Sequence, residues 1–150
     1  MIEIKQLAIG DLTAFTSLLE IFKKVFENEE AVIHEAQLQK LLMNPDFIVF
    51  VVKFNDQIIG GLTIYVLHRY FGSKPVAYIY DMGIDPNFQG KGFGKALIAE
   101  VCSFCKRNGF EDAYVEAESE DLEAVAFYSR TNFSEKLNAT HFIYTFTNEK

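Results

Sequence analysis

The sequence contains only two cysteines and has no run of 18 apolar residues. Cys102 and Cys105 have the C-x-x-C spacing of a redox pair or of half a zinc site, but no second such pair is present. Their neighbours follow the apolar stripe of a helix, which favours two buried free thiols. Together with the lack of a signal-peptide pattern at the N-terminus, these absences predict a soluble cytoplasmic protein with no membrane partner.

Basic residues are fewer than acidic ones: the chain has 14 Lys and Arg and 21 Asp and Glu, which gives a formal charge of -7. An acidic surface repels phosphate backbones, so we expect no nucleic-acid partner. The same surface attracts cations. Acidic balance is also common among ordinary soluble proteins, so simple solubility and a cationic substrate both remain open.

Length and composition predict one domain that spans residues 1–150. A chain of 150 residues can bury most of the surface that its unfolded form exposes. Hydrophobic residues make up 49% of the chain and include 15 phenylalanines, a composition that disordered and collagen-like proteins do not have.

Hydrophobic periodicity predicts the element order β-α-α-β-β-β-α-β-α-β. Gly60 and Gly61 fall inside the third strand and indicate a bulge or a close backbone approach. The order describes an α/β fold, in which a central mixed sheet of six to seven strands carries about four helices on its faces. The expected strands are 2–9, 47–54, 57–67, 76–84, 113–118 and 140–147, and the expected helices are 12–25, 34–43, 92–107 and 122–131.

A glycine-rich turn, Gln89–Lys95, lies between the strand that ends at Ile84 and the following helix. The first amides of a helix have no intrahelical partners, and residues without a Cβ let a phosphate approach them closely. A P-loop would need a hydroxyl residue where Ala96 stands, and a dinucleotide-binding turn would need G-x-G-x-x-G spacing. The turn therefore predicts a diphosphate site of another class.

The spacing of Gln89, Gly92 and Gly94 after a strand resembles the Gln/Arg-x-x-Gly-x-Gly/Ala motif of the Gcn5-related N-acetyltransferase family. A second segment, residues 124–133, is similar to that family's Ala-x-x-Phe-Tyr-x-x-x-Gly-Phe motif, with Asn132 in place of the glycine. The resemblance implies a single acetyltransferase domain that uses acetyl-coenzyme A and no metal. It implies coenzyme contacts at Met82, Gly83, Ile84, Gln89, Gly90, Lys91, Gly92, Phe93, Gly94, Lys95, Asp121, Phe127 and Tyr128.

Acetyl transfer to an amine needs a neutral nucleophile and a group that protonates the departing thiolate. Asp81 interrupts an apolar strand, where a carboxylate must be paired or lie in a cleft, so it is a candidate base or amine-orienting group. Tyr128 matches the tyrosine that the family places near the coenzyme sulfur, which implies the role of acid. Turn capping by Asp81 and plain packing of Tyr128 are the structural alternatives.

The chain as a whole resembles the short aminoglycoside 3-N-acetyltransferases, in which the aspartate of the central strand faces the amino sugar. This resemblance gives the same role to Asp81 and suggests a homodimer. Glu116 and Glu118 alternate along the next predicted strand and, with Glu27 and Glu30, would form an acidic groove for a small cationic amine. Polyamines and peptide amines remain alternative acceptors, and a coenzyme A sensor without catalysis is the alternative of another class.

Overall fold

The structure is a computed structural model that describes residues 1–147. The chain divides into two compact units, of which the first spans Met1–Glu116 and the second begins at Ala117. Among the described residues, no helix combines the length and the apolar character needed to cross a membrane. The expectation of one domain over residues 1–150 stays a prediction.

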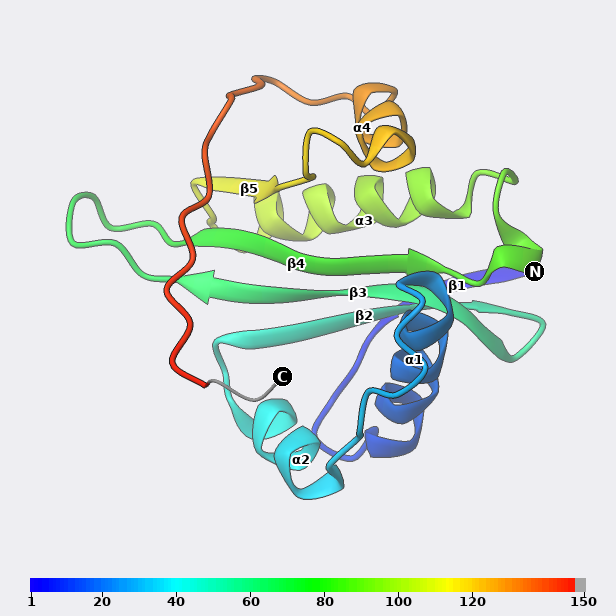
Figure 1. Ribbon diagram of the computed structural model, residues 1–150. Coiled ribbons are helices and arrows are strands. Elements are labelled where there is room, and N and C mark those ends of the chain that lie inside the picture. The colour runs from blue at the N-terminus through cyan, green and yellow to red at the C-terminus, as the bar shows by residue number, and fades with distance from the viewer. Residues whose placement is uncertain (148–150) are drawn as a thin grey trace. The chain divides into compact units, whose positions relative to one another are not determined.

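The first unit is built on a mixed sheet of five strands whose spatial order follows the chain (Figure 1). The first three pairings are antiparallel and the last, between β4 and β5, is parallel. The strands are β1 (Ile2–Gln6), β2 (Phe47–Phe54), β3 (Gln57–Leu67), β4 (Val76–Ile84) and β5 (Asp112–Val115). The helices of the chain are α1 (Leu12–Val25), α2 (Glu35–Met43), the 3-10 turn η1 (Pro86–Phe88), α3 (Phe93–Arg107) and α4 (Leu122–Ser129), the last of these in the second unit.

Helices cover both faces of the sheet, with α1 and α2 on one face and α3 on the other (Figure 1). Alternate residues of β2 supply both layers: Val49 and Val51 pack with α1 and α2, whereas Phe50 and Val52 pack with α3. On α1 the buried residues recur at three- and four-residue steps, as the sequence predicts, and they include Phe15, Leu18 and Phe22. α1 is therefore held against the sheet by one apolar stripe.

Gly60 and Gly61 occupy positions at which a side chain has no room. A Cβ on Gly61 would lie 2.3 Å from the Phe50 carbonyl oxygen and 2.9 Å from Leu18, and a Cβ on Gly60 would lie 2.6 Å from the Gly83 carbonyl oxygen. The register between β2 and β3 also shifts beside them. The predicted bulge and the predicted close approach are both confirmed. Because Gly61 has no side chain, Leu18 of α1 packs directly on β3.

Three sequence-based expectations about the elements are wrong. The sheet has five strands because residues 140–147, although rich in β-branched and aromatic residues, have no strand partner within the described residues. β-propensity describes how well a side chain fits a half-buried sheet, and it does not supply the neighbouring strand. β5 ends at Val115, so Glu116 and Glu118 lie beyond it. Both cysteines are free, but only Cys105 is buried.

Cys102 is exposed because Leu97, Val101 and Cys105 follow one another at four-residue steps along the buried side of α3. Cys102 stands one residue after Val101, a rotation of about 100° around the helix, which moves it away from the sheet.

Candidate active site

The glycine turn joins the end of β4 to the start of α3. The side-chain amide of Gln89 donates a hydrogen bond of 2.8 Å to the Ile84 carbonyl oxygen, which closes the turn back onto the strand. Gly90 and Gly92 have φ values of 77° and 89°, in the left-handed region that favours glycine. Gly92 is the N-cap of α3, so no side chain caps the amides of the first helical turn.

The surroundings of this turn fit an anion. No atom lies within 4 Å of the positions that a Cβ on Gly90 or Gly92 would take, so the backbone is open to a close approach. Lys91 and Lys95 are exposed on either side of Gly92. Uncapped amides, the positive end of the helix dipole and two ammonium groups together match a pyrophosphate.

Asp85 secures the turn, and the sequence interpretation missed it. Its carboxylate is 11% exposed, and one oxygen accepts a hydrogen bond of 2.9 Å from the Asn87 amide. The other oxygen lies 3.1 Å from the Lys24 ammonium at the end of α1. The Asn87 amide, and then Lys24, hold the pKa of Asp85 below its ordinary value, while burial opposes them. The start of the turn is thus fixed to α1.

β4 contains a β-bulge next to Asp81. Leu62 of β3 pairs with Met82 and Ile64 pairs with Ile79, so Tyr80 and Asp81 together lie opposite Thr63. The Asp81 amide donates to the Thr63 hydroxyl at 3.3 Å. Bulges re-aim side chains and are frequent beside active sites.

The bulge places Tyr80 and Asp81 on the same face of the sheet. The Tyr80 ring packs edge-on against Tyr65, with centroids 5.4 Å apart. Burial raises the pKa of Tyr65 above its ordinary value, and the neighbouring Tyr80 and the charge of Asp81 raise it further. Burial also raises the pKa of the Asp81 carboxyl above its usual value. A carboxyl with a raised pKa comes closer to the pKa of an effective base at neutral pH.

The ladder between β4 and β5 uses the whole of β5 but only the first part of β4. It joins Val76–Ile79 of β4 to Asp112–Val115 of β5 and stops there, although β4 continues to Ile84. Residues 80–84 of β4 therefore have no partner on β5, and they lead toward the glycine turn. A crevice at the carboxyl end of diverging strands is the usual ligand position in open sheets.

A tyrosine strip crosses the same face of β3, β4 and β5 and consists of Tyr65, Tyr80, Tyr78 and Tyr114. Tyr78 meets the edge of Tyr80 at 5.9 Å and stacks on Tyr114 with centroids 4.8 Å apart and an interplanar angle of 16°. The Tyr78 hydroxyl donates a hydrogen bond of 3.0 Å to the Glu116 carboxylate. Glu116, which the sequence predicts as a substrate residue, is thus bound to this strip by a hydrogen bond.

The remaining acidic candidates of the first unit lie after α1. Glu27 has a left-handed φ of 54°, and hydrogen bonds from the Phe26 amide to Phe22 and from the Asn28 amide to Lys23 close the helix around it. Glu30 is exposed in the same connection. Neither residue has a contact that links it to Asp81, so their substrate role stays a prediction.

The other predicted site residues belong to the second unit. Asp121 caps α4 by accepting a hydrogen bond of 3.2 Å from the Ala124 amide. The rings of Phe127 and Tyr128 pack against each other at 5.0 Å, and the Tyr128 carbonyl oxygen accepts a hydrogen bond of 2.6 Å from the Thr131 hydroxyl. Glu118 is exposed before the helix. Their roles toward a coenzyme or a substrate stay predictions.

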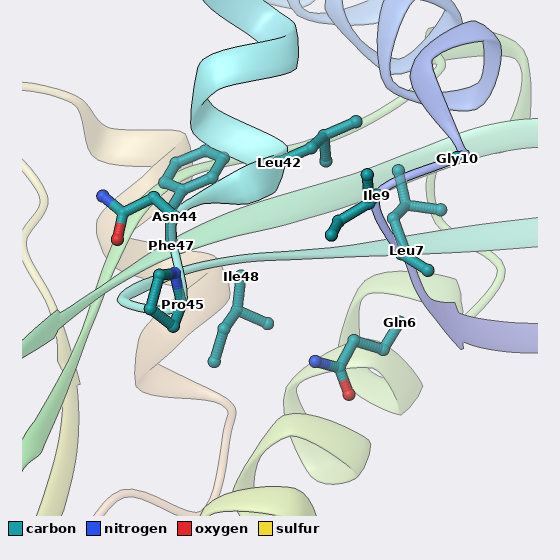
Figure 2. Close-up of a pocket in the computed structure, with 10 residues that line it drawn as sticks. Gln6, Leu7, Ile9, Gly10, Leu42, Asn44, Pro45, Phe47 and Ile48 are labelled. Carbon is teal, nitrogen blue, oxygen red and sulfur yellow. The ribbon is translucent and has the colours of Figure 1, made fainter.

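A hollow elsewhere in the first unit has a cavity volume of about 670 Å³ (Figure 2). It lies between the segment after β1, with Leu7 and Ile9, and the end of α2, with Leu42 and Asn44. None of the predicted site residues lines it, and its lining carries no titratable side chain. Residues 1–147 also contain no group of three His, Cys, Asp or Glu that could hold a metal ion.

Comparison with known proteins gives one family. The sequence profile described as the Acetyltransferase (GNAT) family matches residues 15–133. The uncharacterized N-acetyltransferase CgeE of Bacillus subtilis is 28% identical over 133 residues, or 86% of this chain. These residues make up 49% of that relative, so the chain spans about half of its length.

Solved structures of acetyltransferases also match the chain. The aminoglycoside acetyltransferase meta-AAC0020, from an uncultured soil metagenomic sample, was solved with trehalose and is 40% identical, with 97% of each chain covered and a TM-score of 0.94. A second structure of it, with sisomicin, is 39% identical with the same coverage and TM-score. The aminoglycoside N-acetyltransferase AAC(6')-Iy, solved with CoA, is 18% identical with a TM-score of 0.79 over 96% of this chain and 95% of its own, and shares the fold.

Proposed function

The chain belongs to the acetyltransferase (GNAT) family, and from this premise we propose that it transfers acetyl from acetyl-coenzyme A to a primary amine of a small polycationic acceptor, an aminoglycoside. The observation that carries the proposal is the continuity of β4. One strand holds a half-buried carboxyl, Asp81, in a bulge, and its end is joined through η1 to an open glycine turn at the N-terminus of α3. The proposed amine site and the proposed diphosphate site are thus separated by only a short stretch of backbone.

The donor site comprises the glycine turn and the end of β4. Gly90 and Gly92 leave their backbone open, so the amides of the first turn of α3, with Lys91 and Lys95, would bind the pyrophosphate of the coenzyme. Met82, Gly83 and Ile84 would lie along the pantetheine arm. The AAC(6')-Iy structure with CoA supports the same coenzyme for this fold.

In the proposed chemistry the amine nitrogen attacks the thioester carbonyl carbon, and the carbon–sulfur bond breaks. Asp81 orients the acceptor ammonium and accepts its first proton, which leaves a neutral amine to attack; burial has raised the pKa of Asp81 toward that of an effective base. Tyr128 donates a hydrogen bond or a proton to the departing thiolate, and the second proton that the nitrogen loses after the attack balances the one that the thiolate gains. By the family resemblance, Phe127 and Asp121 would also contact the coenzyme. The products are an acetamide and coenzyme A.

The acceptor assignment follows from charge and from the relatives. The chain carries a formal charge of -7, and the acidic groups Asp81, Glu116, Glu27 and Glu30, with Glu118 in the second unit, suit a substrate with several ammonium groups. The relative meta-AAC0020 was solved with sisomicin in one structure and with trehalose in another. Polyamines and peptide amines are the competing acceptors. The resemblance also leads us to propose a homodimer.

The test is a coenzyme A release assay with acetyl-coenzyme A and a panel of amines: sisomicin, kanamycin, spermidine and a lysine peptide. We expect kcat/KM for the aminoglycosides to exceed that for the other amines. No turnover of any aminoglycoside would refute that acceptor. A coenzyme sensor would be stabilised by coenzyme A in a thermal-shift assay and would release none from acetyl-coenzyme A.

Asp81→Asn tests the residue at the centre of the proposal. We expect kcat to fall by about 100-fold or more, the loss typical of a general base, while the Kd for coenzyme A stays near the wild-type value. The control is Asp56→Asn, which makes the same change in the turn between β2 and β3. Equal activity of the two variants would remove Asp81 from the mechanism. Tyr128→Phe should slow turnover rather than weaken coenzyme binding.

A further inference from the structure

The tyrosine strip has a carboxylate near each end. Asp81 lies at the Tyr65 end, where its charge acts on the Tyr65 hydroxyl, and Glu116 lies at the Tyr78 and Tyr114 end. Four rings in successive contact join the two ends across β3, β4 and β5. Tyr80 and Tyr114 are 55% and 40% exposed, so the strip offers aromatic surface to a ligand.

Tyr78 has a particular place in this strip. Its ring is held between Tyr80 and Tyr114, and the parallel register sets Tyr78 directly beside Tyr114. Glu116 follows Tyr114 by two residues and so shares its side of the extended chain. The Tyr78 hydroxyl reaches this carboxylate at 3.0 Å. An otherwise exposed glutamate, just beyond the end of β5, is thereby tied to the sheet.

The direction of this hydrogen bond is fixed at neutral pH. Burial, and then the hydrogen bond with Glu116, raise the pKa of Tyr78 to about 12, so the phenol keeps its proton and donates it to Glu116. The second oxygen of Glu116 remains for a cation. A long, exposed side chain normally loses rotamer entropy when it binds a charged ligand, and a restraint made beforehand lowers that loss.

Building on the proposed function, we propose that Tyr78 is a positioning residue that fixes the Glu116 carboxylate as a second ammonium anchor, one strand away from Asp81. The acceptor amine is held at Asp81 and a second amino group of the same molecule at Glu116. The exposed rings between them pack on the carbon skeleton of the acceptor and attract its charges. The site therefore selects molecules that carry at least two amino groups.

A double-mutant cycle on sisomicin tests whether Tyr78 acts through Glu116. Tyr78→Phe removes only the hydroxyl and keeps the ring stack, and we expect the KM for sisomicin to rise about fivefold with kcat within about twofold of wild type. Glu116→Gln should raise this KM about tenfold, and the double variant should not exceed Glu116→Gln. Additive effects of the two changes would overturn the proposal, because Tyr78 would then act independently.

Tyr70→Phe is the control, since it removes a hydroxyl from a tyrosine that is 92% exposed in the connection between β3 and β4 and is not a member of the strip. Its KM for sisomicin should stay within about twofold of wild type. Glucosamine, with a single amino group, is the matched acceptor, and Tyr78→Phe should leave its kcat/KM within the same range. An equal loss for glucosamine and sisomicin would overturn the role of a second anchor.

Failure of the proposed function is distinguishable from failure of this inference. If the wild-type protein releases no coenzyme A whichever amine is supplied, the transferase proposal fails. The same cycle is then measured as the Kd of sisomicin by titration calorimetry. Losses of sisomicin affinity that are not additive would support Glu116, positioned by Tyr78, as a cation anchor. If the wild-type protein does not bind sisomicin, the proposed anchor is overturned as well.

Discussion

Replacement of Asp85 by Asn tests how the glycine turn is held. The carboxylate has one oxygen on the Asn87 amide at 2.9 Å and the other on the Lys24 ammonium at 3.1 Å. Asparagine keeps an oxygen that accepts from the Asn87 amide and loses the charge that attracts Lys24. The substitution therefore isolates the ion pair from the turn hydrogen bond.

The expected loss of stability lies between that of a surface pair and that of a buried one. Asp85 is 11% exposed but Lys24 is 50% exposed, so solvent screens one side of the interaction. Surface pairs contribute about 0–1 kcal/mol and hydrogen bonds to charged groups about 1.5–3 kcal/mol. We expect the free energy of unfolding to fall by about 1.5 kcal/mol, and the Tm by about 3–6 °C for a chain of this size.

The pH dependence of this loss has a defined sign. The folded state holds the pKa of Asp85 below its ordinary value. The carboxyl therefore contributes stability that is fully present above its unfolded pKa of about 3.9 and is lost as the pH falls through the folded pKa. The difference between wild type and Asp85→Asn should be constant from about pH 7 to about pH 5 and should shrink below about pH 4.

Urea unfolding at neutral and at acidic pH measures this difference, and the KM for acetyl-coenzyme A measures its effect on the turn. We expect that KM to rise about three- to tenfold, because a looser turn presents its amides less accurately. Lys24→Met should reproduce the effect, and Lys23→Met is its control because Lys23 pairs with the exposed Glu20 at 3.7 Å. Wild-type stability of Asp85→Asn at pH 7, or a difference that persists unchanged at pH 3, would refute the reasoning.

Three further substitutions have defined outcomes. Gly92→Ala should lower the free energy of unfolding by about 1 kcal/mol, because φ at this position is 89°. The variant should also raise the KM for acetyl-coenzyme A about tenfold or more, since its methyl group would occupy the open space beside the backbone of the glycine turn. An unchanged KM would contradict the proposed pyrophosphate site at this turn. Glu27→Gly should stabilise the fold by about 0.5–1 kcal/mol in thermal unfolding, since φ is 54°, while the KM for the acceptor rises; a lower Tm would contradict this. Gly61→Ala should destabilise by about 3 kcal/mol in urea unfolding, because its Cβ would lie 2.3 Å from the Phe50 carbonyl oxygen, and wild-type stability would show that β2 yields easily.

Local patterns predicted most of the fold. The three- and four-residue apolar steps of α1 place it at Leu12–Val25, and the tight polar break at residues 55–56 gives the hairpin of β2 and β3 with the predicted bounds. The GNAT membership was predictable too, because the turn and the Phe127-Tyr128 segment are contiguous motifs. Each of these features depends on residues that are neighbours along the chain.

The features that the sequence did not predict depend on distant residues. Lys24 and Asp85 are 61 positions apart, and Tyr78 and Glu116 are 38 positions apart, so no spacing rule joins either pair. The bulge that turns Asp81 toward the tyrosine strip results from a register between β3 and β4, which propensity does not encode. The predicted strand at 140–147 failed for the related reason that a strand needs a neighbour as well as a composition.

The connection between α1 and α2 has a consequence for the evolution of this protein. It carries Glu27 and Glu30 outside any regular element, whereas Asp81 lies in β4 and the glycine turn leads into the first turn of α3. Loops tolerate substitution and insertion far better than the elements that they join. Under the proposed function, acceptor preference and acetyl chemistry therefore depend on separate parts of the first unit. Grafting this connection from a relative, or randomising residues 28–33, should redirect the enzyme to new amines while its donor machinery stays intact.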